Sequence, residues 1–325
     1  MPELPEVETV RIGLAKLLPQ KEIADVWHDW PKGFPNAPSD VARFMLGAKV
    51  LRVKRRAKVL IIELSSEYSL VIHLKMTGQL VFVGAASKNK QSPVASRQSP
   101  AKKLSITQFP LPSSGEPERF GAGHPNKSLI GELPDKSTRV VIDFKDDSTL
   151  FFNDQRKFGW MRLLPTVQVP DIDFLKKVGP EPLDHDFTVE RFIERLHTRK
   201  KSGIKAVLLD QTVLAGVGNI YADESLFMAR IHPEMKVADI TRPKLVALHG
   251  DLIDILKLSI KKGGSTDRNY VNAEGKRGSY IDFAQVFRRE NQPCPRCGAT
   301  IEKIRAAGRG THICPNCQKI PTVQS

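Results

Sequence analysis

The sequence has few cysteines and no long apolar run, and both absences restrict the class of protein. Only four cysteines occur in 325 residues, and all lie between positions 294 and 317. They are too few and too clustered for the disulfide framework of a secreted protein. No apolar run approaches the length of a membrane span, and no basic segment with an apolar core precedes a cleavage site. We therefore expect a soluble, intracellular protein.

Acidic residues are also in short supply. The chain has 36 Asp and Glu against 50 Lys and Arg, which gives a formal net charge of +14. Such an excess of positive charge attracts a polyanion by releasing its counterions. Charge alone does not separate a nucleic-acid-binding protein from one that is merely basic.

The N-terminal half has the pattern of a β-rich domain. Helical spacing of apolar residues predicts a helix over 6–18. Short apolar runs predict strands and a sandwich or barrel, at 49–54, 58–64, 69–74, 80–83, 139–144 and 149–153. Between them, residues 84–137 hold seven prolines and nine serines without periodicity. This composition predicts a long disordered insertion.

The C-terminal half is predicted to be helical. Thr188 is a candidate cap for one helix, and further helices are expected at 203–210, 219–231 and 241–262, the last ending at two glycines. The sequence therefore predicts a multidomain α+β protein with four parts. These are a β-rich domain at 1–165, a linker at 166–180, a helical domain at 181–285 and a cysteine-bearing module at 286–325.

The four cysteines have the spacing of a metal site. Cys294 and Cys297, then Cys314 and Cys317, form two C-x2-C pairs separated by sixteen residues. Four thiolates spaced in this way can close a tetrahedral shell around Zn²⁺. A closed shell leaves no position for water, so we expect one structural zinc ion. Disulfides or free thiols are the alternative, and they are disfavoured in an intracellular chain.

Three other patterns are weaker and leave alternatives open. The stretch AGVGN at 215–219 could hold a phosphate at a helix start or form only a tight turn, with Asn219 as its cap. Met76 and Phe158 lie in predicted loops, where they could enter a base stack, or they are core residues. Lys58 begins a strand, where a lysine also serves to discourage edge-to-edge aggregation.

The opening stretch, MPELPEVETV, has two prolines and three glutamates in its first eight residues. Pro5 and the acids that follow suit a helix start, but Pro2 and Glu3 precede that helix. Removal of Met1 would give Pro2 a free secondary amine, part of which is unprotonated near neutral pH. A deprotonated amine is a nucleophile that can form a Schiff base, and Glu3 would be its neighbouring acid or base.

Together these patterns resemble the formamidopyrimidine-DNA glycosylases, bacterial enzymes that excise oxidised purines such as 8-oxoguanine. The resemblance spans nearly the whole chain except 84–137. Its motifs are PELPEVE at 2–8, RRAK at 55–58, HLKMTGQL at 73–80, DQRKFG at 154–159, GPEPL at 179–183, GVGNIYADESLF at 216–227, GGST at 263–266 and the cysteines. It implies an N-terminal β-sandwich with flanking helices, a helix–two-turn–helix domain and a zinc finger.

The resemblance also implies roles for individual residues. Pro2 would attack C1′ of the damaged nucleotide, with Glu3 as acid and base and Glu6 supporting the wall of the site. Phosphate or other DNA contacts would come from Lys58, His73, Asn219 and Arg309. The gap left by the everted base would be filled by Met76, Arg156 and Phe158, and residues 265–280 would close over that base. The partner would be duplex DNA with oxidised bases or abasic sites, bound by a monomer in the bacterial cytoplasm at the nucleoid.

Some residues depart from the family pattern, and two other functions remain open. Gln155 stands where a proline is common, and Lys157 replaces a second arginine. Endonuclease VIII, a relative that removes oxidised pyrimidines, usually opens with PEGPE, whereas this chain has Leu4. A DNA-binding protein without catalysis is the other alternative, and the presence of Pro2, Glu3 and Lys58 argues against it.

Overall fold

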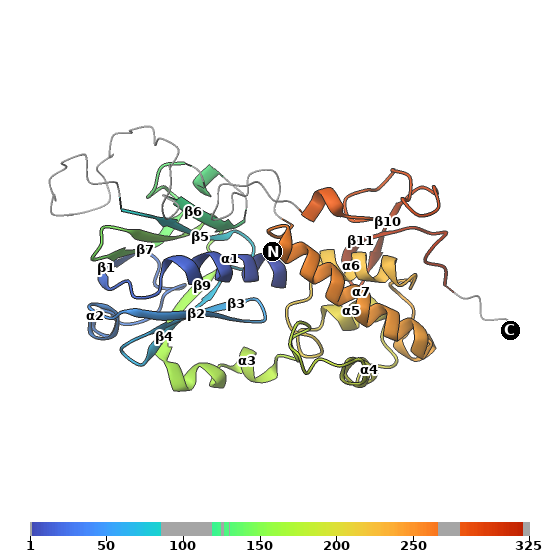
Figure 1. Cartoon of the computed structure of the whole chain (residues 1–325), viewed down its shortest axis with the longest axis horizontal. Coiled ribbons are helices and arrows are strands. Elements are labelled where there is room, and N and C mark those ends of the chain that lie inside the picture. The colour runs from blue at the N-terminus through green and yellow to red at the C-terminus, as the bar shows by residue number, and fades with distance from the viewer. Residues whose placement is uncertain (1, 86–118, 125–126, 130, 266–279, 321–325) are drawn as a thin grey trace.

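A computed structural model describes residues 2–85, 119–124, 127–129, 131–265 and 280–320 (Figure 1). The chain forms a β-sandwich lobe and a helical lobe that ends in a small β-hairpin. Both sheets of the sandwich are antiparallel. In spatial order, one sheet has β1 (Ile23–His28), β7 (Thr138–Phe144), β8 (Thr149–Asp154), β5 (Gly78–Val83) and β6 (Arg119–Gly123). The other has β2 (Val50–Arg56), β3 (Val59–Leu64), β4 (Tyr68–His73) and β9 (Trp160–Pro165).

The core of the sandwich lies between the two sheets. Alternate residues of the central strands point inward, so Leu60, Ile62 and Ile72 of one sheet join Leu80 and Phe152 of the other in one buried cluster. The chain changes sheets in three connections, from β1 to β2, from β4 to β5 and from β8 to β9. Each connection therefore crosses the thickness of the sandwich.

Helix α1 (Leu4–Leu17) packs on the sandwich and brings the start of the chain to the junction between the lobes (Figure 1). Val7, Val10 and Leu14 face the sandwich core. Gly13 lies against the ring of Phe120 on β6, and a Cβ atom there would be 2.1 Å from that ring. Only glycine allows this close approach. The short helix α2 (Pro38–Met45) covers the far end of the same lobe.

The helical lobe has the predicted helices, with small changes in their bounds. They are α4 (Val189–His197), α5 (Ile204–Leu209), α6 (Asn219–Met228) and α7 (Arg242–Lys261). Thr188 caps α4 as expected, because its side chain accepts a hydrogen bond from the Arg191 N–H at 3.2 Å. Gly263 and Gly264, both with positive φ, end α7. Strands β10 (Glu302–Ala306) and β11 (Arg309–Ile313) form the hairpin of the cysteine module. The predicted fold class, a β-sandwich followed by a helical part and a four-cysteine module, is confirmed.

Two expectations about irregular segments need correction. The composition of 84–137 predicts a structureless insertion, but β6 and the 3-10 turn Lys127–Leu129 lie inside that range. Two glycines in the five residues of β6 hide it from a search for apolar alternation. The expected linker contains the 3-10 helix Thr166–Asp171 and helix α3 (Asp173–Lys177), which pack on the outer face of β3, β4 and β9. Residues 86–118 and most of the expected base-covering loop lie outside the described residues.

Within the ranges that the structure describes, no helix combines the length and apolarity needed to cross a membrane.

The fold predicts how much of the insertion can be removed. Val83 pairs with Arg119 across β5 and β6, so the described strands on either side of segment 86–118 lie next to each other. Replacing 86–118 by a short Gly-Ser linker should leave the melting temperature nearly unchanged. Extending the deletion to residue 124 should cost about 3–5 kcal/mol or more, because it removes the buried Phe120. Thermal unfolding of the two deletions beside the full chain tests this, and equal stability of both deletions would contradict the role given to β6.

Candidate active site at the junction of the lobes

Glu3 lies buried where the two lobes meet. It is the residue before α1, and its side chain is only 5% exposed, while Pro2 beside it is also buried. One carboxylate oxygen of Glu3, Oε1, accepts a hydrogen bond from the Ile220 N–H at 3.1 Å. The other oxygen, Oε2, is buried and has no hydrogen-bond partner among the described residues. One oxygen is thus held by the start of α6, whereas the other can still accept a hydrogen bond.

The glycine motif before α6 leaves space for this carboxylate. A Cβ atom on Gly218 would be 2.2 Å from the Glu3 carboxyl carbon, so a side chain there would displace the acid. The Leu4 N–H donates to the Gly216 carbonyl at 3.0 Å and fastens the start of α1 to the same turn. The positive end of α6 therefore faces an anion, as a helix start favours. That anion is the chain's own Glu3, and the helix cap is Gly218 rather than Asn219.

Burial has a large effect on the charge of Glu3. It raises the pKa of Glu3 from 4.5 to about 7, the positive charge of Lys58 opposes this rise, and the carboxylate of Glu6 adds to it. A carboxyl with a pKa near neutrality can both give and take a proton at working pH.

Lys58 is the buried cation of the site. It stands in the turn between β2 and β3, is only 4% exposed, and its Nζ donates to the Val217 carbonyl at 3.0 Å. The reading of Lys58 as a surface charge on a strand edge is therefore wrong. Burial lowers its pKa, the carboxylates of Glu3 and Glu6 raise it, and the nearby charge of Arg309 lowers it.

Glu6 joins the lobes through a chain of buried hydrogen bonds. Its Oε2 accepts from the Glu3 N–H at 2.7 Å, and its Oε1 accepts from the Ser265 N–H at 2.7 Å. The Tyr221 hydroxyl also donates to Oε1, at 2.5 Å, and lies 2.6 Å from the Ser259 hydroxyl, which is then the donor to Tyr221. Glu6 thus connects α1 to α6 and to the end of α7, which fits a supporting role.

The cysteine module carries Arg309 to the same region. Ala307 and Gly308, both with positive φ, form the two-residue turn of the hairpin, and the exposed Arg309 follows it. The Asn219 amide donates to the Gly310 carbonyl at 3.0 Å and holds this turn beside the start of α6. The hairpin therefore places a cation near Lys58.

The loops between the sheets carry the remaining candidates. Met76 and Phe158 are 40% and 52% exposed, so the core reading of these two residues is wrong. The guanidinium of Arg156 lies over the ring of Phe158, with its carbon 4.6 Å from the ring centroid. His73 is buried, its Nδ1 accepts from the Lys75 N–H at 3.0 Å, and burial with nearby lysine charges lowers its pKa to about 3. It is a neutral ring that carries its proton on Nε2.

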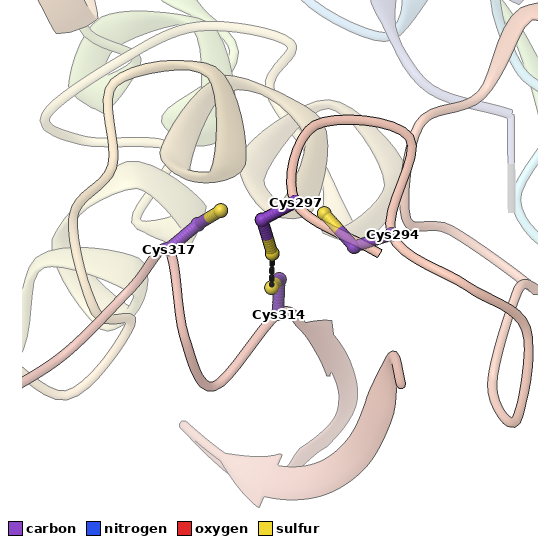
Figure 2. A group of neighbouring side chains, drawn as sticks. All are labelled: Cys294, Cys297, Cys314 and Cys317. Carbon is purple, nitrogen blue, oxygen red and sulfur yellow. Dashed lines mark hydrogen bonds between the residues drawn. The ribbon is translucent and has the colours of Figure 1, made fainter. Parts of the chain in front are cut away.

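The four cysteine sulfurs gather at one point (Figure 2). The sulfurs of Cys294, Cys297, Cys314 and Cys317 all lie within 4.8 Å of one another, and those of Cys297 and Cys314 are 3.5 Å apart. In a tetrahedral zinc–thiolate site the sulfurs are about 3.8 Å apart, so this cluster fits one ion.

Comparison with known proteins decides the family. The model of the formamidopyrimidine-DNA glycosylase N-terminal domain matches residues 1–161, and that of its H2TH domain matches residues 178–270. A zinc finger found in FPG and IleRS matches residues 291–320. The formamidopyrimidine-DNA glycosylases of Pediococcus pentosaceus and Ligilactobacillus salivarius are each 37% identical, over 98% of this chain and 99% of their own length. This chain belongs to the formamidopyrimidine-DNA glycosylase family.

Solved structures agree with this assignment. The Lactococcus lactis Fpg in complex with an abasic site containing DNA matches with a TM-score of 0.77 and 32% identity, over 98% of this chain and 100% of that one. A MutM in complex with carbocyclic 8-oxo-G containing DNA matches with a TM-score of 0.76 and 33% identity over the same shares. For a member of this family, the cysteine cluster is the site of one structural zinc ion.

Three further residues take part in the site, and the sequence patterns did not predict their roles. Tyr221 and Ser259 hold Glu6, and Gln211 braces the glycine turn through the Gly216 N–H at 2.9 Å and the Val217 carbonyl at 2.8 Å. Apolar periodicity assigns Tyr221 to a helix but says nothing of its hydroxyl. The polar run of the motif at 216–227 was the available signal, because such residues inside a buried helix need partners.

The raised pKa of Glu3 predicts a pH-dependent cost in stability. A carboxyl whose pKa is higher in the folded state lowers the free energy of unfolding once it is ionised. This cost is absent below the unfolded pKa of about 4.5 and is complete above a pH of about 7. At pH 8 the free energy of unfolding of Glu3→Gln should therefore exceed that of the unmodified chain by on the order of 1–3 kcal/mol. This difference should disappear towards pH 5. Glu234→Gln, at an exposed acid, is the control. Parallel pH curves for all three proteins would contradict the burial argument.

The metal site gives a second prediction. Cys314 is fully buried, and Cys314→Ser removes one of four ligands. The variant should purify with much less than one zinc per chain and should bind duplex DNA weakly, because the folding of such modules depends on their ion. Lys303→Ala, at an exposed residue of β10, should keep its zinc. Metal analysis and filter binding check both, and a full zinc content in Cys314→Ser would contradict the ligand assignment.

Proposed function

We propose that this protein is a bifunctional DNA glycosylase and abasic-site lyase that excises oxidised purines from duplex DNA. Membership of the family supports this proposal, as do neighbours bound to DNA with an abasic site, Fapy-dG or carbocyclic 8-oxo-G. The observation that carries it is the buried Glu3, which has one oxygen held by α6 and one unpartnered among the described residues, directly beside Pro2.

The chemistry begins with Pro2 once Met1 has been removed. Its secondary amine attacks C1′ of the damaged nucleotide, the bond from C1′ to the base breaks, and the base leaves with its bonding electron pair. Glu3, with a pKa of about 7, takes the proton that the attached amine must lose and delivers it to the ring oxygen, so the bond from C1′ to that oxygen breaks and an iminium forms. The resulting iminium makes the C2′ protons acidic. Loss of one expels the 3′ phosphate, and a second elimination expels the 5′ phosphate.

The cations of the site suit the DNA backbone. Lys58 and Arg309 lie close enough for the charge of Arg309 to lower the pKa of Lys58, which favours an anion between or beside them. We assign phosphate contacts to both, with Asn219 and the Nε2–H of neutral His73 as further donors. Met76, Arg156 and Phe158 stand exposed on two of the sheet-crossing loops, where they can fill the space left by an everted base.

A second substrate class has its own support. One structural neighbour, with a TM-score of 0.76 and 32% identity, is the Lactococcus lactis Fpg in complex with an oxidized pyrimidine containing DNA. Oxidised pyrimidines are therefore the second candidate substrate for this chain.

Trapping of the Schiff base tests the proposed function. Zinc-loaded protein is incubated with duplexes that contain 8-oxoguanine or an oxidised pyrimidine, each opposite its normal partner, in the presence of borohydride. Reduction of the iminium should give a covalent adduct, formed faster with 8-oxoguanine. Mass spectrometry should place the adduct on the peptide that begins at Pro2. A protein that binds these duplexes but gives no adduct would be a binder without catalysis, and faster trapping on the pyrimidine would make that lesion the main substrate.

A further inference from the structure

Two loops connect the two sheets at the same end of the sandwich. The first joins β4 to β5 over 74–77 and carries Met76, and the second joins β8 to β9 over 155–159 and carries Arg156 and Phe158. The side chains that face solvent on these loops come from segments about eighty residues apart in the sequence. If the three side chains act together, contacts between the two loops must fix the position of one loop relative to the other.

The carboxylate of Asp154 is the group that joins them. Asp154 is the last residue of β8 and is fully buried. Its Oδ1 accepts hydrogen bonds from the Thr77 hydroxyl, in the first loop, and from the Arg156 N–H at 3.1 Å, in the second. Its Oδ2 accepts from the Gly159 N–H at 2.7 Å, at the end of the second loop. The Arg156 N–H also lies 3.2 Å from the Thr77 hydroxyl oxygen, which closes the link.

This arrangement requires a carboxylate rather than any polar side chain. Both oxygens receive donors, three in all, and an asparagine in the same place would turn an NH₂ group towards at least one of them. A buried carboxylate is costly unless such donors surround it. No ion pair joins Asp154 to a cation in the described part of the chain, so hydrogen bonds to the two loops are its main compensation there.

The second loop is also fitted closely against the end of β4. A Cβ atom on Gly159 would be 3.0 Å from the His73 carbonyl oxygen and 3.1 Å from Asp154 Oδ2. His73 ends β4, and the first loop begins at the next residue. The two loops are therefore in contact at their bases, while their tips with Met76 and Phe158 remain exposed.

We propose that Asp154 is a positioning residue for base eversion: its carboxylate sets the spacing between Met76 on one loop and the Arg156–Phe158 pair on the other. The proposal rests on the proposed glycosylase function and deepens it. Filling a vacated base position requires several side chains to enter the duplex together, and loops already held in register lose less conformational entropy on doing so. Asp154 touches neither base nor sugar in this role and acts only through the two loops.

The first test separates eversion from the later chemistry. With Asp154→Asn, single-turnover excision of 8-oxoguanine should slow about tenfold, the effect expected for weakening charge-assisted hydrogen bonds. Cleavage at a preformed abasic site should change by less than about twofold, because no base has to be expelled there. Met76→Ala should show the same split. Asp146→Asn changes an exposed carboxylate that accepts from Ser148 and pairs with Lys21, in the turn at the other end of β8, and should leave both rates unchanged.

A second variant protects the test against a folding defect. Thr77→Val keeps the shape of the side chain but removes the hydroxyl that bridges Asp154 and Arg156, whereas Thr77→Ser keeps that hydroxyl. Thr77→Val should reproduce the split and Thr77→Ser should restore the normal ratio. The double variant Thr77→Val, Asp154→Asn should be little slower than the slower single variant, because both remove the same link.

The outcomes distinguish this inference from the proposed function. If the unmodified protein gives no excision and no adduct, the glycosylase function itself is wrong. The inference is overturned if the unmodified protein excises 8-oxoguanine but Asp154→Asn and Thr77→Val slow excision and abasic cleavage equally. It is also overturned if these variants slow neither reaction, and in both cases Asp154 is only a structural residue.

Discussion

A carboxylate with almost no access to water lies at the junction of the two lobes, and much of the surrounding structure serves to hold it there. Burial of Glu3 would be prohibitive without compensation. The compensation comes from two distant segments, which are the β2–β3 turn that carries Lys58 and the start of α6, where Gly218 leaves room for the acid. These segments belong to both lobes, so the surroundings of the acid depend on how the lobes pack together. The compensation is incomplete, because Glu3 keeps a pKa of about 7, a value that suits the acid and base role of the proposed function.

Sequence patterns predicted β2, β3, β4, β5, β7 and β8, and they missed β1, β6 and β9. β3, β4, β5 and β8 are buried along nearly their whole length and read as continuous apolar runs. β1 is an edge strand with mostly exposed or half-buried residues, and β6 has two glycines, so neither has a strong local pattern. What fixes β6 is tertiary: Phe120 packs on Gly13 of α1, about a hundred residues earlier, and the pairing with β5 supplies its hydrogen bonds. Propensity and periodicity contain no information of that range.

The site divides in the same way. Spacing alone predicted the zinc ligands, because a metal shell imposes a short and regular pattern on the chain. The chemistry of a terminal amine pointed to Pro2 as a nucleophile with Glu3 as its acid or base, and the resemblance to a family added the reaction at C1′ of a damaged nucleotide. Neither route revealed that Gly218 is needed for the Glu3 carboxyl, or that Asp154 bridges two loops, because both depend on which backbone groups meet in three dimensions. Hydrogen bonds from side chains to backbone leave little trace in sequence, since the backbone partner can be any residue type.

Helix α6 contacts both the segment that carries Glu3 and the hairpin that carries Arg309, and so fixes the distance between these two residues. Its first turn holds Glu3 through the Ile220 N–H and holds the hairpin turn through Asn219 and the Gly310 carbonyl. One turn further on, the buried Asp223 accepts from Lys205 Nζ at 2.6 Å and from the His312 N–H at 3.0 Å, which fastens β11 to the same helix. Glu224 accepts from the backbone N–H groups of Val286 and Phe287, at the entry to the cysteine module.

A shift of α6 would therefore carry Glu3 and Arg309 together and preserve their separation. A change within the zinc module would reach Arg309 first, and would reach Glu3 only through a helix that is buried along most of its length. In the proposed function, a change at the metal site would therefore affect the phosphate contact of Arg309 before it affected Glu3.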